Sequence, residues 1–404
     1  MLYKNIYIDG VLSDITVEDG VIVRISEAAD NPDSLSDSKD FKGQAWALPG
    51  LVNMHTHSAM TLFRSIGSGL PLQRWLSEAI FPREARLTPD DIYRGALEAC
   101  EEMKATGTTT FNDMYFNIES TIRAAIETGM QAEVSMSLTD RDFEDGSESS
   151  TAKKFFDNCD KLAASLPKSI KIGVAPHSIY AVSGEHLKYA ADFAAEHDML
   201  FHIHISETQA ENANCINEHG MTPVEYLDSL GVLDKTGSRF IGAHALWLSL
   251  SDMQLLGEHG ATVVHCPNSN LKLGSGSMFP YSELCQAGVN VTLGTDGCAS
   301  SDNLDMIEAM KVMSLLQKGW RHDPSVLPAD EVLKVATSNG YKALGFDDAV
   351  IAEGHKANFT LVDLTKRAFR NMDLDSLDKA ERQKLFLDRL IYAANGECVE
   401  CLNA

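Results

Sequence analysis

The sequence predicts an α/β fold, a parallel (β/α)₈ barrel of the TIM type, with a small β-sandwich domain assembled from both ends of the chain. Three observations support this prediction. From about residue 49 onwards, short β-branched segments alternate with helical segments, as in consecutive βα units. Eight such strands can be counted, which is the number that closes a barrel. Strand patterns also occur before residue 48 and after residue 350, outside the alternation.

The two chain ends are expected to pair in one small domain. Near the N-terminus, strands are predicted at Asn5–Ile8, Asp14–Glu18 and Val21–Ile25, joined by Asp-Gly turns. Strand character returns at Ala357–Asp363. We therefore expect these domain boundaries: 1–48 for the first part of the β domain, 49–349 for the barrel, and 350–404 for the second part.

The barrel is expected to begin with the apolar run that ends at His57, followed by a loop with short helices over Ser58–Thr88. The other seven strands are predicted at Thr108–Met114, Gln131–Leu138, Ile170–Ala175, Leu200–Ile205, Phe240–Ala243, Ala261–His265 and Val289–Gly294. Helices are predicted at Pro89–Ala105, Ile118–Thr128, Thr151–Ser165, Ser183–Glu196 and Ser251–His259, with a helical pair near Thr208–Leu230 and more from Leu304 onwards.

Composition narrows the class of protein. The chain has 404 residues, 44% of them apolar, and a formal net charge of −24. Such a charge argues against binding to nucleic acid or an anionic membrane, because phosphate groups need Lys and Arg partners. The first residues alternate like a strand and do not resemble a signal peptide, so we expect a cytoplasmic protein. A homo-oligomer is expected as well. Eight scattered cysteines suggest reduced thiols, and Cys398-Val-Glu-Cys401 is interpreted as incidental spacing.

The chemistry is predicted to centre on the first barrel strand. His55 and His57 are two residues apart, so they project on the same face of that strand. Two imidazoles placed in this way can bind one transition-metal ion. A pair of hydrogen-bonded histidines near a turn would be the alternative. The other strand ends therefore decide between the two interpretations.

A barrel places its reactive groups where strands run into the following loops. Polar residues end five of the predicted strands. They are His55 and His57 on strand 1, His177 on strand 4, His204 and Glu207 on strand 5, His244 on strand 6, and Asp296 on strand 8. Together they predict a metal site with additional histidines. After strand 7, by contrast, the Cys266–Asn270 stretch is expected to shape a loop more than to take part in catalysis.

The whole pattern resembles the amidohydrolase superfamily. Within it, the sequence is most similar to 5-methylthioadenosine/S-adenosylhomocysteine deaminases, and the similarity spans nearly the entire chain. Three stretches carry this resemblance: Pro49–Arg64, Ile80–Thr88 and Gly294–Met306.

The resemblance implies a metal site with His55, His57, His204 and Asp296 as ligands of one divalent ion, which we expect to be zinc. Relatives with a second metal carry a carboxylated lysine at the end of strand 4. This chain has Ala-Pro-His there, so a single ion is expected. Water bound to zinc has a pKa of roughly 7, which makes a nucleophile available at neutral pH.

The resemblance also implies an acid–base arrangement for adenine deamination. Glu207 would take a proton from water and deliver it to the ring nitrogen beside the reacting carbon. His244 and Asp296 would orient the attacking oxygen, and Asp296 would help to carry a second proton to the departing ammonia. The reaction expected is hydrolytic deamination of adenosine, methylthioadenosine or S-adenosylhomocysteine.

Four residues are implied to contact the substrate. His177 would lie near the purine or ribose, and Glu84 would accept hydrogen bonds from ribose hydroxyls. Trp75 either forms a wall of the pocket or packs its loop. Arg141 is the single arginine in the loop after strand 3, Thr139–Ser149, where it stands among five acidic residues. That charge balance favours methylthioadenosine or adenosine over S-adenosylhomocysteine, whose tail carries a carboxylate.

Two other hypotheses remain open at this point. The same metal chemistry would serve an aminohydrolase or chlorohydrolase acting on another heterocycle, such as guanine or an s-triazine. A barrel scaffold without catalysis belongs to a different class, and the complete ligand set with Glu207 argues against it. The C-terminus is a separate matter. The chain is short after Cys401 and is expected to leave an edge of the β domain unfilled.

Overall fold

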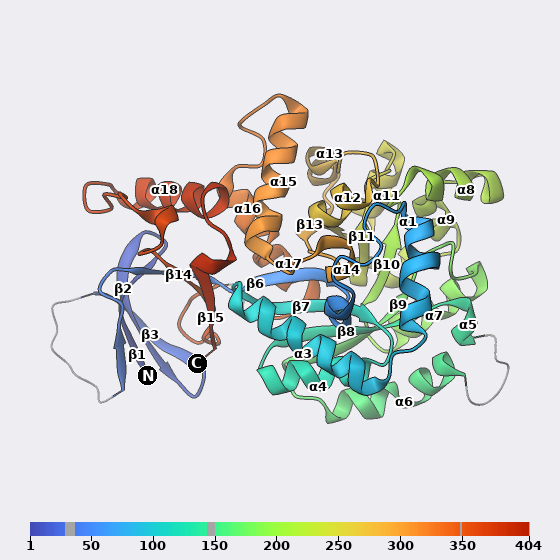
Figure 1. Cartoon of the computed structure of the whole chain (residues 1–404), viewed down its shortest axis with the longest axis horizontal. Coiled ribbons are helices and arrows are strands. Elements are labelled where there is room, and N and C mark those ends of the chain that lie inside the picture. Colours follow the sequence, from blue (N-terminus) through green and yellow to red (C-terminus); the bar gives the residue numbers. More distant parts are fainter. Residues whose placement is uncertain (29–36, 144–149, 348–349, 404) are drawn as a thin grey trace. The chain divides into compact units, whose positions relative to one another are not determined.

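A computed structural model describes residues 1–28, 37–143, 150–347 and 350–403 (Figure 1). The chain divides into two compact units. The first comprises residues 1–52, 101–110 and 305–404, and the second comprises residues 53–100 and 111–304. The two units are defined by how compactly their residues pack, whereas the predicted domains were defined by the order of strands and helices. The predicted domain boundaries therefore stay a prediction.

The second unit contains most of a parallel eight-stranded sheet that is curved into a nearly closed barrel, as the sequence predicted. The spatial order of the strands, from β13 back to β6, follows their order in the sequence, so each strand pairs with its neighbours along the chain. They are β6 (Leu51–Thr56), β7 (Thr108–Tyr115), β8 (Gln131–Leu138), β9 (Ile170–Pro176), β10 (Phe201–Ile205), β11 (Phe240–His244), β12 (Thr262–His265) and β13 (Asn290–Leu293). Just beyond β13, the Asp296 N–H donates to the His55 carbonyl at 2.9 Å, which joins the last strand region to the first.

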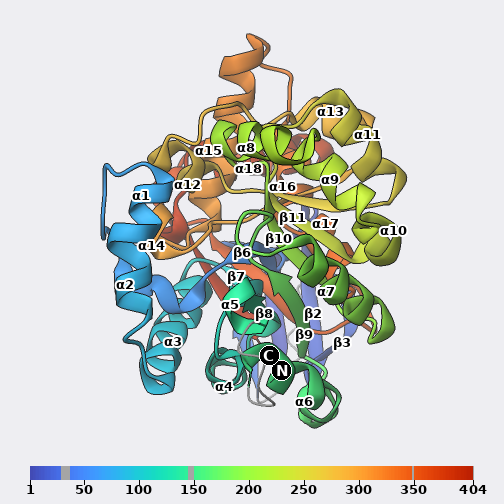
Figure 2. The same cartoon turned by 90° about the vertical axis from the view of Figure 1, so that its right-hand side faces the viewer.

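Helices lie outside the barrel strands, as Figure 2 shows for α4, α7 and α9. The longer ones are α3 (Pro89–Ala105), α4 (Ile118–Thr128), α6 (Thr151–Ser165), α7 (Gly184–Glu196), α8 (Gln209–His219), α9 (Pro223–Ser229) and α11 (Leu250–Glu258). The shorter ones are α5 (Asp140–Phe143), α10 (Val232–Thr236), α12 (Pro267–Leu273), α13 (Tyr281–Gln286), α14 (Cys298–Ser301) and the 3₁₀ helix η3 (Gly237–Arg239). Caps that match the sequence fix several of these ends. At α9, for example, Thr222 and Glu225 form a reciprocal capping box.

The segment after β6 folds as predicted, into short helical pieces: η1 (Ser58–Phe63), α1 (Leu72–Arg74), the π-helix η2 (Trp75–Ile80) and α2 (Phe81–Glu84). Their apolar side chains form one buried cluster with Ile92 and Tyr115. This cluster holds the segment in place without any regular sheet pairing.

The first unit contains a seven-stranded sheet built from both chain ends, which confirms the predicted composite β domain. Its strands are β1 (Leu2–Ile8), β2 (Val11–Glu18), β3 (Val21–Glu27), β4 (Ser38–Asp40), β5 (Ala45–Pro49), β14 (Asn358–Asp363) and β15 (Val399–Asn403). The helices of this unit are α15 (Met306–Arg321), α16 (Ala329–Val335), α17 (Ser338–Leu344), α18 (Lys379–Tyr392) and the 3₁₀ turns η4 (Arg367–Phe369) and η5 (Gly396–Cys398). Trp46 on β5 stacks between Tyr7 and Phe386, with ring centroids 5.2 and 3.9 Å apart, so α18 covers the sheet. Cys401 lies on β15, the strand at one end of the sheet order.

Candidate metal centre and substrate pocket

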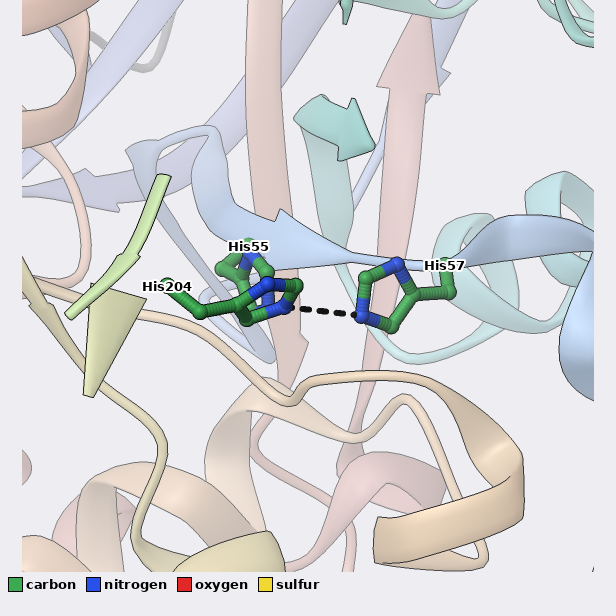
Figure 3. A group of neighbouring side chains, drawn as sticks. All are labelled: His55, His57 and His204. Atoms are coloured by element: carbon green, nitrogen blue, oxygen red, sulfur yellow. Dashed lines mark hydrogen bonds between the residues drawn. The ribbon is translucent and has the colours of Figure 1, made fainter. Parts of the chain in front are cut away.

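Four polar side chains from three strand ends converge at the carboxyl-terminal face of the barrel. His55 lies one residue before the end of β6 and His57 just after it, His204 lies on β10, and Asp296 stands three residues beyond β13. Figure 3 shows the three imidazoles facing one another. Their ring nitrogens all lie within 4.8 Å of each other. All four predicted ligands therefore share one small volume.

Hydrogen bonds on the far side of each ring direct the free nitrogens inwards. His57 Nδ1 lies 2.6 Å from the Met114 carbonyl, and His204 Nδ1 lies 2.7 Å from the His177 carbonyl. A carbonyl only accepts, so both Nδ1 atoms carry a hydrogen and both Nε2 atoms are left to face the centre. His55 Nδ1 contacts His202 Nε2 at 3.0 Å, which makes His202 a hydrogen-bonded neighbour of the centre.

The centre fits a cation. The Nε2 atoms of His57 and His204 lie only 3.3 Å apart, and the buried Nε2 of His55 has no hydrogen-bond partner. The Asp296 carboxylate lies 3.2 Å from His57 Nε2 and 3.6 Å from His55 Nε2. Burial would lower the pKa of His57, yet Asp296 raises it to about 9, so a positive charge is favoured here. Three imidazole nitrogens and one carboxylate are the ligands that zinc prefers.

Backbone strain accompanies this geometry. Left-handed φ angles occur at Ser206 (49°), His244 (77°), Ala245 (49°) and Asp296 (66°), all of them non-glycine residues at the ends of barrel strands. Such angles are uncommon for these residue types and cluster at functional sites. Here they turn the chain so that Glu207, His244 and Asp296 face the same space.

The predicted acid–base residue lies beside the predicted metal ligands. Glu207 is buried, and burial together with the Asp296 carboxylate raises its pKa to about 8, while the Ser275 hydroxyl opposes the rise. Its Oε2 lies 3.7 Å from His244 Nε2. Glu211, one turn into α8, accepts from the backbone N–H groups of Ser206 and Glu207 at 2.9 and 2.8 Å, which fixes the backbone of Glu207. A carboxyl with a pKa near neutrality can both take up and release a proton.

His244 lies within reach of the same centre. It ends β11 and is buried, and burial lowers its pKa to about 4, so the ring is neutral. One of its ring nitrogens lies within 4.8 Å of ligand atoms of His55 and Asp296. The sequence assigned it to orienting the attacking oxygen, and its position next to Glu207 is compatible with that role.

A cavity of about 770 Å³ opens above these residues. Its floor is formed by His57, His177, His204, Glu207, His244 and Asp296. The walls include three of the predicted substrate residues, Trp75, Glu84 and Arg141. Apart from His55, which is fully buried, every site residue predicted from the sequence therefore lines this one cavity.

The wall residues have distinct surroundings. Trp75 both lines the cavity and packs its loop, since its indole N–H donates to the Ile66 carbonyl at 2.9 Å. Burial raises the pKa of Glu84, and the neighbouring Tyr115 hydroxyl opposes that rise. His177 follows β9, and its Nδ1 lies 3.1 Å from the Ser178 hydroxyl. Burial lowers the pKa of His177 to about 4, so this ring is neutral as well.

Arg141 is exposed on α5 at the cavity rim. Two of its acidic neighbours already have partners. Asp140 accepts from the Ser183 N–H and lies 2.7 Å from His186 Nδ1, while Asp142 accepts from the Thr139 N–H and hydroxyl. The other three acidic residues of the predicted loop, Glu144, Asp145 and Glu148, lie outside the described residues.

Four residues of the site were not foreseen from the sequence. Tyr115, at the end of β7, lines the cavity beside Glu84. Ser269, Asn270 and Ser275 contact the floor from the segment after β12. The rule that placed the histidines at strand ends also applied to Tyr115, whereas no local pattern marked the three residues after β12. The Cys266–Asn270 stretch therefore does more than shape a loop: it forms part of a short helix against the site.

Known proteins match the chain over most of its length. A family model described as "Amidohydrolase family" matches residues 46–397. A 5′-deoxyadenosine deaminase from Methanothermobacter thermautotrophicus is 43% identical over 350 residues, which cover 86% of this chain and 80% of the relative. A 5-methylthioadenosine/S-adenosylhomocysteine deaminase from Pyrococcus furiosus is 40% identical over 359 residues, which cover 88% and 83%.

A solved structure agrees with the fold and with the candidate metal centre. It is an adenosine deaminase from Xanthomonas campestris with bound zinc, 32% identical in sequence. Its TM-score to this chain is 0.87, and the alignment covers 98% of this chain and 90% of that one. In the part of the chain that the structure describes, no helix is both long and apolar enough to cross a membrane.

Proposed function

Since the chain belongs to the amidohydrolase family, we propose that it is a zinc-dependent aminohydrolase that removes ammonia from the adenine base of a nucleoside or thionucleoside. One observation carries this proposal. Three imidazole nitrogens and the Asp296 carboxylate converge in the floor of a cavity that also holds the buried Glu207. The relatives named above are deaminases of 5′-deoxyadenosine, of methylthioadenosine and S-adenosylhomocysteine, and of adenosine, which supports the choice of base.

His55, His57, His204 and Asp296 would hold the ion. When bound, zinc lowers the pKa of a coordinated water to roughly 7 and provides positive charge beside the reacting carbon. The water oxygen bonds to the ring carbon that carries the amino group, and the bond from that carbon to the amino nitrogen breaks. One water proton goes to the adjacent ring nitrogen and another leaves with ammonia.

Glu207 performs the first of these proton transfers. Its raised pKa suits a group that takes a proton from water and gives it to the ring nitrogen. His244 and Asp296 orient the attacking oxygen, and Asp296 helps to pass the second proton to the leaving amine. The low pKa of His244 keeps its ring neutral, so that it acts as a hydrogen-bond donor and not as a charge.

The walls supply the substrate contacts. A cavity of this size falls within the range of about 300–1,000 Å³ that small-molecule sites occupy. Glu84 and Tyr115 would bind the ribose hydroxyls, and His177 would contact the purine or ribose. Trp75 and the neighbouring apolar side chains Leu72, Leu76 and Phe81 favour an uncharged 5′ group. We therefore place methylthioadenosine, 5′-deoxyadenosine and adenosine ahead of S-adenosylhomocysteine.

Ammonia release tests the proposal. Zinc-loaded protein is offered methylthioadenosine, 5′-deoxyadenosine, adenosine, S-adenosylhomocysteine, guanine and an aminotriazine, with Glu207→Gln as the control for contaminating deaminases. We expect release from the adenine nucleosides, in the order given, and none in the variant. Release from guanine or the triazine alone would overturn the choice of substrate. The cytoplasmic location, the homo-oligomer and the absence of nucleic-acid binding stay predictions.

A further inference from the structure

One stretch of chain after β12 contacts three groups of the proposed acid–base machinery. It runs through α12 to Ser275, and we name residues 267–275 the positioning segment. We propose that this segment holds the reacting groups in their working orientation, with Ser269, Asn270 and Ser275 each fixing one side chain. The inference rests on the proposed deaminase function.

Each contact of the positioning segment reaches a different reacting group. The Ser269 hydroxyl donates to Asp296 Oδ2 at 2.6 Å. The Asn270 side-chain nitrogen lies 3.1 Å from His244 Nδ1. The Ser275 hydroxyl donates to Glu207 Oε1 at 3.3 Å. These three acceptors are far apart in the sequence, yet a single turn of helix and its exit reach all of them.

Burial makes these bonds hard to replace. Ser269 is fully buried, and Asn270 and Ser275 are 7% and 6% exposed. Bulk water therefore has little access to the oxygen or nitrogen that loses its donor. A buried carboxylate whose donor is removed is free to rotate, and that change acts on the reaction directly.

The contact of Asn270 determines which nitrogen of His244 carries the proton. A neutral imidazole has one N–H and one lone pair. Because the Asn270 amide N–H₂ donates to Nδ1, the lone pair is at Nδ1 and the hydrogen is at Nε2. Nε2 is also the nitrogen that faces Glu207, at 3.7 Å from Oε2. Asn270 thus makes His244 a donor toward the cavity.

Local sequence indicates that the segment is not selected for helix formation. Ser269 and Asn270 lie inside α12, where both residue types are weak helix formers and tend to bond nearby backbone. Here their side chains instead reach Asp296 and His244. The helical propensity lost at these two positions is compensated by contacts with the site.

The exit of the segment is held firmly. Gly274 ends α12 in the left-handed region, and the Ser275 N–H donates to the Asn270 carbonyl at 3.0 Å. The Trp247 indole N–H donates to the Ser275 carbonyl at 2.8 Å. Gly276 has φ of 107°, and a Cβ there would lie 2.7 Å from the Trp247 ring. These contacts fix the backbone of Ser275, from which its hydroxyl reaches Glu207.

The test uses zinc-loaded full-length protein. Asn270→Asp keeps the shape of the side chain, but a carboxylate cannot donate, so the His244 proton is expected to move to Nδ1. In a serine protease, the wrong histidine tautomer costs about 10⁴ in kcat. We expect kcat to fall by at least about 10²-fold here, with KM within about twofold. Nitrogen-15 NMR of labelled histidines, with His244 assigned by its substitution, reports the tautomer directly.

Two further variants and a control separate positioning from stability. Ser275→Ala is expected to lower kcat about tenfold, since one hydrogen bond to the Glu207 carboxyl group is lost, whereas Ser275→Thr keeps the hydroxyl and restores most of kcat. Ser120→Ala is the matched control, because Ser120 is also buried but donates to the Pro89 carbonyl on another face of the unit. Zinc content and melting temperature are measured for every variant.

Clear outcomes overturn the inference. A wild-type kcat in Asn270→Asp, or a His244 proton that stays on Nε2, would show that Asn270 does not set the tautomer. If kcat falls only in variants whose melting temperature also falls, and Ser275→Thr does not rescue it, the segment has a merely structural role. If the wild-type protein releases no ammonia from any nucleoside, the proposed function fails, while the NMR measurement still decides the contact between Asn270 and His244.

Discussion

The floor and the walls of the cavity are built in different ways. The floor consists of buried and half-buried strand-end residues whose polar atoms are directed by specific hydrogen bonds, as with His57 on Met114 and His204 on His177. The walls come from short helical pieces, η1 to α2 and α5, which present mostly apolar side chains and a partly exposed rim. The difference suggests that the floor carries the chemistry and the walls choose the substrate. Changes in the floor should then act on kcat, and changes in the walls on KM.

Metal removal changes only the floor of the cavity and should produce the largest loss of activity. After chelation, activity is expected to fall by at least about 10³-fold, since a metal ion supplies several kcal/mol of charge stabilisation in the transition state. The melting temperature should also fall, because an ion held at 100 times its Kd stabilises the fold by about 2.7 kcal/mol. Ammonia release and calorimetry before and after reloading with zinc measure both. Full activity in protein shown to be free of metal would contradict the idea that the floor carries the chemistry.

Glu207→Gln tests whether a change at one floor residue lowers kcat and leaves KM, the quantity assigned to the walls, nearly unchanged. The amide cannot take a proton from water, so we expect kcat to drop by about 10²–10⁴-fold while KM stays within a few-fold. Steady-state kinetics with methylthioadenosine and adenosine gives both values. Glu185→Gln, an exposed change on α7, is the matched control and should leave both unchanged. A rise in KM with kcat preserved would place Glu207 among the binding residues instead.

The same contrast explains what the sequence could and could not predict. The barrel and the convergence of His55, His204 and Asp296 were predictable because parallel strands end at one face. The choice of ligands among the strand-end residues came from the family resemblance. Glu84 was identified only by resemblance, since an acidic residue between two arginines looks like any exposed glutamate. Ser269 and Asn270 could not be distinguished from ordinary loop residues. Their partners are set by how the chain turns after β12, and no local pattern encodes that turn.

Glu84→Gln should act through a wall and therefore on KM. The carboxylate accepts stronger hydrogen bonds from ribose hydroxyls than an amide does, so KM for adenosine is expected to rise about tenfold with little change in kcat. For 2′-deoxyadenosine, which lacks one of these hydroxyls, the rise should be smaller. Kinetics on both substrates decides the point. Glu78→Gln is the control from the same helical segment, where Glu78 is exposed and paired with Arg74 at 2.7 Å. An equal rise for both substrates would remove Glu84 from the ribose site.

Arg141→Met should produce the smallest effect, restricted to a substrate with a charged tail. Methionine keeps an apolar stem and removes the cation. An exposed ion pair contributes only about 0.2–1 kcal/mol, so KM for S-adenosylhomocysteine should rise at most about fivefold. KM for methylthioadenosine, which has no carboxylate, should change less than about twofold. Raising the salt concentration should narrow the difference between wild type and variant, since an exposed charge is screened. Arg86→Met, an exposed change just past α2, is the control. A loss of kcat with both substrates would mean that this rim residue reaches the chemistry, and floor and walls would not be separable at α5.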